Sequence, residues 1–476
     1  MSTERKGNRA VMAIAGLFAL LLAGMIYSWS IFARSIGADF PEWGSTKLST
    51  IFTLLMAFFC IGIFICGFLS KKVSPGRIMW LGAACLFAGF ALASRAESVG
   101  MLILGFSMLC GAGSGLAYNA VIATVTKWFP DKKGFISGLL LMAFGFSGFL
   151  VGKLFQAYTP QETGGWRGSF LVMGIVCAVV IAIAGMFVKA PEAGGGAAKN
   201  EGGAAMSDAA KNEGGATMSD AAKNAGGATM SDATKNEGGA TMSDAARNAG
   251  GAAMSAAAKN ESGADGGAAP AGHGRKTDYT PREMVASPKF WLYYIWTVAL
   301  SMAGLVLIAQ AGGAAAATVP TYTGSAIATV VGLISIANGG GRIVVGWIFD
   351  KVGRATSMNI INIAFIISAV ALTIALRSGS SVLLIAGFIL LGFGYGGAPV
   401  CNAAFVSSAF GLKNYSMNLP VVNTCLLAAS VGSTISGAIY EATSSYGAIY
   451  LFMAALAIAG GLCGNIIVLI ERKESR

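Results

Sequence analysis

One arginine lies inside a stretch of sequence that is long and apolar enough to cross a lipid bilayer. Arg342 lies within residues 326–349, AIATVVGLISIANGGGRIVVGWIF. Near the centre of a membrane helix an arginine costs at least about 2.5 to 3.5 kcal/mol on insertion scales, so a cavity, an ionic partner or an anionic ligand must offset it. A guanidinium group suits a carboxylate, because its planar fork donates paired hydrogen bonds and keeps its charge. We therefore interpret Arg342 as the candidate ligand-binding residue.

The composition indicates the surroundings of this stretch. The chain has 476 residues, of which 55% are hydrophobic and 12% are charged, and this balance is typical of an integral membrane protein. Runs of about 20 apolar residues can each cross a bilayer as a helix. They begin near residues 11, 48, 78, 100, 135, 168, 288, 323, 358, 382, 416 and 447. We expect an all-α membrane protein with six helices before residue 189 and six after residue 287.

The basic residues predict the orientation of these helices. If the N-terminus is cytoplasmic, most Lys and Arg of the short loops are also cytoplasmic, and the outside receives only Arg34, Lys47, Arg95, Arg167 and Arg377. This bias follows the positive-inside rule and places both termini in the cytoplasm, with the plasma (inner) membrane as the expected location. It also accounts for the net charge of +11, so we expect lipid headgroups and no nucleic acid as partners.

Polar and small residues share one face of the helix that contains Arg342. Ser335, Asn338, Arg342 and Gly346 are separated by three, four and four positions, which is the periodicity of a helical face. The alternative is that Arg342 extends to the cytoplasmic headgroups. Helical side chains tilt toward the N-terminus, and this helix is expected to run inward, so Arg342 starts out directed toward the bilayer centre. We favour the ligand role.

Residues 189–287 separate the two sets of helices and contain a repeat of twelve residues, such as AAKNEGGAAMSD and AAKNEGGATMSD. Each copy offers only alanines and one methionine for packing, so we expect a disordered cytoplasmic linker. The expected domains are a first six-helix bundle at 1–188, the linker at 189–287 and a second six-helix bundle at 288–476.

Six helices, a long loop and six more helices resemble the layout of the major facilitator superfamily. The segment GWIFDKVGR, which contains Asp350 and Arg354, resembles the GxxxDxxGR loop of that superfamily. The resemblance implies a conformational latch, in which ion pairs of these residues bias alternating access. The equivalent segment of the first half, GFLSKKVSPGR, ends at Arg77 but has Lys71 in place of the acid. There we favour anchoring at the membrane surface.

Four segments are similar to the oxalate/formate antiporter family, a branch with carriers of oxalate, formate, pyruvate and lactate. They are GMIYSWSIF, GAGSGLAYNAVIATVTKWFPDKKGFISG, ISIANGGGR and FGLKNYSMN. The resemblance implies that Arg342 binds the carboxylate of the substrate. It also implies that Tyr27 and Tyr118 close the cavity around the anion.

Three further residues complete the expected substrate site. Asn338 shares the helical face of Arg342. Tyr395 lies midway along a predicted helix in GFGYGGAP, where glycines permit close helix approach and the proline permits a break. Asn423 lies in NLPVVNTCLLAASVGS, a stretch that resembles the eleventh helix of the oxalate carrier. That carrier has a second cation there, a lysine, whereas this stretch has none.

The number of fixed charges predicts the substrate class. One positive charge suits one negative charge, so we expect pyruvate, lactate or formate in preference to oxalate. Lys153 is the other cation inside a predicted span and could supply a second charge, although its place near the outer end favours extension to the headgroups. All Asp and Glu residues fall in predicted loops, termini or helix ends. This favours anion exchange, or symport in which the proton travels with the substrate.

The sequence supports two other function classes less well, an enzyme and a membrane sensor. An enzyme would need a nucleophile with a base, paired carboxylates or a metal cluster, and the one histidine, His273, lies in the linker, so we expect no enzyme activity, no metal and no cofactor. A membrane sensor that binds a carboxylate and signals through the linker is the alternative function. We favour a monomeric secondary transporter that works by alternating access.

Overall fold

The computed structural model describes residues 3–70, 72–129, 133–159, 164–190, 278–411 and 414–474. Within these ranges, twelve helices are long and apolar enough to cross a membrane, which confirms the predicted all-α fold. The repeats of the linker lie outside the described residues. Large apolar side chains such as Val172, Ile363 and Leu462 are exposed, as lipid contact requires.

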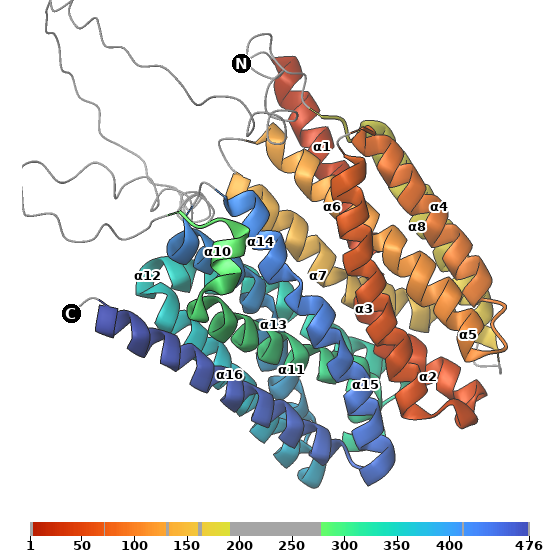
Figure 1. Cartoon of the computed structure of the whole chain (residues 1–476). Helices are drawn as coiled ribbons and strands as arrows, with labels where there is room; N and C mark the ends of the chain where they lie inside the picture. The colour runs from red at the N-terminus through yellow and green to blue at the C-terminus, as the bar shows by residue number, and fades with distance from the viewer. Residues whose placement is uncertain are drawn as a thin grey trace, which may run out of the picture. The chain divides into compact units, whose positions relative to one another are not determined.

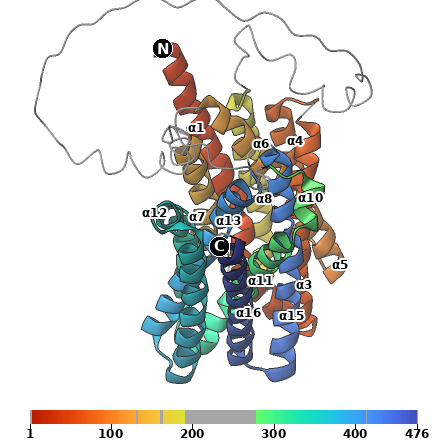
Figure 2. The same ribbon diagram turned by 60° about the vertical axis from the view of Figure 1, so that its left-hand side comes forward.

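The first half contains α1 (Thr3–Ala23), η1 (Gly24–Ser28), α2 (Trp29–Asp39), η2 (Pro41–Trp43), α3 (Gly44–Leu69), α4 (Pro75–Ala93), α5 (Val99–Leu102), η3 (Ile103–Cys110), α6 (Gly111–Val125), η4 (Thr126–Trp128), α7 (Lys133–Tyr158) and α8 (Gly165–Phe187). The second half contains α10 (Pro281–Ala286), α11 (Pro288–Thr318), α12 (Gly324–Ser378), α13 (Ser381–Phe410), α14 (Tyr415–Asn423), α15 (Cys425–Thr443) and α16 (Tyr446–Glu474). Figures 1 and 2 show these helices from two directions.

The first span is not one regular helix. It consists of α1, the tight turn η1 and α2, so the chain is irregular at Tyr27. Gly24 lets this part of the chain pack closely against α7, because a Cβ there would overlap the backbone carbonyl of Phe144. The Ser114 hydroxyl donates to the Ala23 carbonyl at 2.5 Å, so a backbone group at the start of the break is satisfied inside the protein, as a lipid environment demands.

Helix α12 contains two spans, Gly324–Phe349 and Lys351–Ser378. The segment that resembles the GxxxDxxGR loop is therefore helical, apart from a sharp bend at Gly353. There φ is 78° and ψ is 176°, a conformation that side chains other than glycine rarely adopt. A single glycine is enough to turn the chain between the two spans.

The two halves contact each other mainly through α3 with α15 and α7 with α12. Figure 1 shows α3 beside α15, and Figure 2 shows α7 beside α12. Glycines allow the second contact to be close, since a Cβ on Gly148 would overlap the Ser335 hydroxyl and a Cβ on Gly339 would lie 3.1 Å from Cγ of Met142. This packing brings the polar face of α12 against Tyr27 and α7.

Candidate functional site

Arg342 is buried within the protein. It is 8% exposed, and its Nε has no hydrogen-bond partner. One turn earlier, Asn338 is 1% exposed and its Oδ1 also has no partner. Buried polar groups are nearly always paired in proteins, and a buried charge is costly unless it is neutralised. An anion with several acceptor oxygens is the group that this guanidinium suits.

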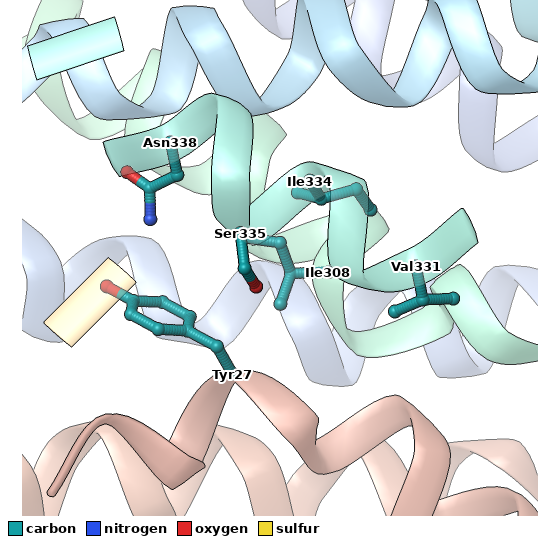
Figure 3. A pocket seen from close by; sticks show the side chains of 6 residues that line it. All are labelled: Tyr27, Ile308, Val331, Ile334, Ser335 and Asn338. Atoms are coloured by element: carbon teal, nitrogen blue, oxygen red, sulfur yellow. The ribbon is translucent and has the colours of Figure 1, made fainter. Parts of the chain in front are cut away.

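A small cavity adjoins this helix face. It has a volume of about 10 Å³ and is lined by Tyr27 of η1, Ile308 of α11, and Val331, Ile334, Ser335 and Asn338 of α12. Figure 3 shows Tyr27 on one side, with Ser335 and Asn338 directed toward it from the other. The volume is close to the minimum that a single water requires, so a carboxylate can enter only if neighbouring side chains move.

Five aromatic side chains, which we call the aromatic cluster, lie around this region: Tyr27, Phe59, Tyr118, Phe144 and Tyr395. The centroid of the Phe144 ring is 4.8 Å from that of Tyr118 and 5.6 Å from those of Tyr27 and Phe59. The Tyr27 and Tyr395 centroids are 6.3 Å apart, and the Tyr118 phenol lies close enough to the Arg342 guanidinium to interact with its charge. Three tyrosines expected from the sequence are thus brought together.

The sequence reasoning missed the two phenylalanines. Phe59 is 4% exposed and Phe144 is 2% exposed. Nothing in their local sequence distinguishes them among the 27 phenylalanines of the chain. Only the packing of α3 and α7 against α6 and η1 shows that they face Tyr27 and Tyr118.

Glycines allow Tyr395 and Asn338 to pack closely against neighbouring helices. A Cβ on Gly304 of α11 would overlap the ring of Tyr395, and a Cβ on Gly396 of α13 would overlap the Asn338 carbonyl. These glycines let α11, α13 and α12 approach closely, as small residues do in membrane bundles. The arrangement fixes Tyr395 beside Tyr27 and buries the backbone next to Arg342.

Asn423 is placed in a different polar cluster. It accepts a hydrogen bond from Nδ2 of Asn402 at 3.3 Å. The Oδ1 of Asn402 in turn accepts from the hydroxyls of Tyr293 and Thr297, each at 2.9 Å. Asn423 is the last residue of α14, directly before the break at Thr424. It does not line the cavity beside Asn338.

Lys153 also lies away from Arg342. Its Nζ donates to the hydroxyls of Ser325 at 2.9 Å and Thr329 at 2.8 Å, both at the start of α12. Thr329 precedes Arg342 by 13 positions, about 20 Å along a helix. In this structure Lys153 therefore joins α7 to α12 and adds no second charge beside Arg342.

Of the three residues of the expected latch, Arg354 and Arg77 have described side chains. Arg354 forms an ion pair with Glu471 of α16, and its guanidinium lies 5.2 Å from the centroid of the Phe405 ring. The side chain of Asp350 lies outside the described residues. Arg77 is exposed at the start of α4. The pairing with Glu471 was not expected from the sequence.

Side-chain hydrogen bonds join the two halves at one end, the far end, where α2 ends and α3 begins. We call this set of hydrogen bonds between the halves the inter-bundle gate. Its members are Ser45, Thr46, Ser49, Thr50, Thr53, Lys153, Gln310, Ser325, Thr329, Ser430, Thr434 and Glu441. These bonds hold α3 against α15 and α11, and α7 against the start of α12.

Two known proteins resemble this chain over most of its length, and a third resembles about a third of it. YhjX, an uncharacterised MFS-type transporter of Escherichia coli (strain K12), is 24% identical over 419 residues, 87% of this chain and 84% of that protein. The oxalate:formate antiporter of Oxalobacter formigenes is 22% identical over 428 residues, 87% of this chain and 81% of that protein. Monocarboxylate transporter 13 of Rattus norvegicus is 28% identical over 162 residues, 34% of this chain and 37% of that protein.

A solved structure supports the same fold. The nucleoside transporter NupG matches with a TM-score of 0.62 at 9% identity, covering 97% of this chain and 99% of that one. The sequence family described as Major Facilitator Superfamily matches residues 10–430. With its twelve apolar helices and its two halves joined across a buried arginine, the chain is an integral membrane transporter, not an enzyme, and belongs to the major facilitator superfamily.

Proposed function

We propose that this chain is a secondary active transporter of small monocarboxylates, with pyruvate, lactate or formate as substrate, in which Arg342 binds the carboxylate. The observation that carries the proposal is the buried guanidinium, whose Nε is unpartnered beside Asn338 and the aromatic cluster. A fixed, desolvated cation of this kind attracts an anion and repels cations.

The aromatic cluster supports an organic anion. Its rings supply apolar surface for the carbon atoms of the substrate, while Arg342 and the tyrosine hydroxyls supply donors for its oxygens. The cavity beside Tyr27 has a volume of only about 10 Å³. We infer that aromatic side chains move aside when substrate binds and close around it afterwards.

The preference for a single negative charge rests on Lys153 and Asn423. Lys153 is bonded to Ser325 and Thr329, and Asn423 is uncharged and bonded to Asn402. A dicarboxylate would then leave one carboxylate without a cation in a medium of low dielectric constant, which is costly. The names of two relatives, an oxalate:formate antiporter and a monocarboxylate transporter, support small carboxylates as the class.

Transport would proceed by alternating access. We propose that the far end faces the outside, with both termini cytoplasmic and the plasma (inner) membrane as the location, and that the protein is monomeric. The inter-bundle gate then closes the outer path, and breaking it opens that path. Asp350, Arg354 and Arg77 remain candidates for a conformational latch at the cytoplasmic end, with Glu471 as the partner of Arg354. Substrate exchange and proton-linked symport both fit this scheme.

Counterflow in proteoliposomes tests the proposal. Vesicles loaded with unlabelled pyruvate, lactate, formate, acetate or oxalate are mixed with the labelled anion, using wild type, Arg342→Gln and Arg342→Lys. We expect wild type to exchange monocarboxylates, Arg342→Gln to lose exchange, and Arg342→Lys to retain a small part, because lysine keeps the charge without the planar fork. Equal flux in wild type and Arg342→Gln would refute the role of Arg342. Tighter apparent affinity for oxalate than for pyruvate would refute the monocarboxylate preference.

A further inference from the structure

A second, larger cavity lies at the far end. Its volume is about 410 Å³, and its lining comes from α2, α3, α11, α15 and α16. The polar side chains in the lining are those of Ser30, Arg34, Ser45, Ser49, Gln310, Tyr440 and Tyr446, and Trp29 and Phe40 supply aromatic surface. Among the described residues that line it, Arg34 is the charged one.

Ser30 and Arg34 form a stripe on α2. They are four positions apart, so their side chains lie on the same face, one turn from each other. Ser30 is 3% exposed, and its Oγ is buried without a hydrogen-bond partner although it lines the cavity. Such an unsatisfied hydroxyl is uncommon, and it lies below an exposed guanidinium whose charge no acid in the lining balances.

Glu441 and Asp39 lie near this cavity but do not line it. Glu441 lies beside Gly44 at the rim, where a Cβ on that glycine would overlap its Oε1. Its carboxylate is engaged by Thr46, which donates its backbone N–H at 2.9 Å and its hydroxyl at 2.5 Å. Asp39, which ends α2, accepts from the backbone N–H of Gly164 at 2.7 Å and from Nε1 of Trp166 at 2.6 Å. The carboxylates of both residues accept hydrogen bonds from Thr46, Gly164 and Trp166, which do not line the cavity.

The two cavities are neighbours along two helices. Tyr27 lines the inner cavity, and Ser30, three positions later, lines the outer one. On α11, Ile308 lines the inner cavity and Gln310 lines the outer one. Between them Gln310 donates to Ser45 at 3.0 Å and to Ser49 at 2.8 Å, across the inter-bundle gate. An anion bound at Arg34 would therefore be separated from the Arg342 region mainly by side chains of the inter-bundle gate.

We propose that the outer cavity is a second anion site, in which Arg34 and Ser30 hold a small carboxylate on its way to or from Arg342. The inference rests on the proposed function, because it takes the same substrate class. The guanidinium of Arg34 supplies the charge and the Ser30 hydroxyl donates to a carboxylate oxygen. Since Arg34 is exposed, water screens its charge, and this site binds more weakly than Arg342.

Equilibrium binding tests the site directly. Radiolabelled pyruvate is titrated against the full-length protein in nanodiscs, using wild type, Arg34→Gln, Arg342→Gln and the double variant. We expect two bound anions per wild-type chain, one tight and one weak. Arg34→Gln should lose the weak one, Arg342→Gln the tight one, and the double variant both.

Transport from the far side gives a second readout. We expect Arg34→Gln to raise the KM for external pyruvate about threefold to tenfold at low salt, with kcat little changed, because Arg34 concentrates the anion before the gate opens. The difference should shrink as salt rises, and Arg34→Lys should restore most of the affinity. Arg95→Gln is the matched control, since Arg95 is an exposed arginine of the same half that lines neither cavity.

The outcomes separate the two proposals. One bound anion in wild type, together with an Arg34→Gln variant that transports like Arg95→Gln, would overturn the second site. The proposed function would survive that result if Arg342→Gln still abolished exchange. Normal exchange by Arg342→Gln would instead refute the proposed function. Gel filtration and thermal unfolding of each variant identify any that fails to fold. Ser30→Ala is a milder change than Arg34→Gln, and we expect it to lower the affinity of the weak site relative to wild type.

Discussion

Thr46 of α3 donates two hydrogen bonds to the carboxylate of Glu441 in α15, from its backbone nitrogen at 2.9 Å and from its hydroxyl at 2.5 Å. The two residues are far apart in the sequence and belong to opposite halves of the transporter. If the far end opens during transport, as we propose, this contact must break.

Glu441→Ala should favour the conformation that is open at the far end. Losing hydrogen bonds to a partly solvated carboxylate costs about 1 kcal/mol, which is about fivefold in the ratio of the two conformations. Hydrogen–deuterium exchange should therefore quicken in peptides from 44–53 and 430–443. Glu97→Ala, which removes an exposed acid of the first half, is the control. Unchanged exchange in both variants would show that the contact does not hold the gate.

Lys153→Met should alter the gate but not the preference for singly charged substrates. The Nζ of Lys153 bonds Ser325 and Thr329, so its loss removes a link between α7 and α12. It leaves the charge around Arg342 unchanged. We expect faster deuterium exchange at the start of α12 and the same ratio of pyruvate to oxalate uptake as in wild type. A selective loss of oxalate uptake, absent from the control Lys47→Met, would identify Lys153 as a second substrate cation.

Phe144→Leu should weaken substrate binding. The ring of Phe144 contacts those of Tyr27, Tyr118 and Phe59, and each such pair contributes about 0.5 to 1.5 kcal/mol. Losing part of this support should raise the KM for pyruvate about fivefold or more. Phe146→Leu is a matched control in the same helix, because Phe146 is 37% exposed. Equal KM values for the two variants would exclude the aromatic cluster from the site.

The residues of the site differ in how far the sequence could predict them. Apolar length was enough for the twelve spans, and helical spacing was enough to join Arg342, Asn338 and Ser335 on one face. Residues that meet from distant helices are not linked by any such periodicity in the sequence. Lys153 and Thr329 are 176 positions apart, and nothing in either segment indicates that they meet.

The same limit applies to Asn423 and to Arg354. Asn423 was expected in the substrate site because of its place in the eleventh span, yet a hydrogen bond from Asn402 of α13 places it in another cluster. Arg354 was expected in the latch, and its ion pair with Glu471, near the end of the chain, is a contact that the sequence did not indicate. Both pairings depend on how α13, α14, α12 and α16 pack, which local patterns do not specify.

Gly148→Ala should stop the two halves from closing at the contact of α7 with α12. An added Cβ would overlap the Ser335 hydroxyl and lie 3.0 Å from Cβ of Tyr27 and 3.2 Å from Cβ of Ser335. Overpacking of this kind typically costs about 1 to 3 kcal/mol, and here it would destabilise the conformation in which α7 and α12 are in close contact. We expect loss of exchange, with faster deuterium exchange at Gly324–Thr329 and Gly44–Thr53.

Gly138→Ala separates this steric effect from the general effect of alanine in a helix. Gly138 is in the same helix, α7, and a Cβ there would meet nothing within 4 Å. Alanine is the better helix former by about 1 kcal/mol, so Gly138→Ala should keep exchange activity and unfold at the same or a higher temperature. If Gly148→Ala behaved like Gly138→Ala, the close approach of Gly148 to Ser335 would not be needed for transport, and the substrate path would have to be sealed elsewhere.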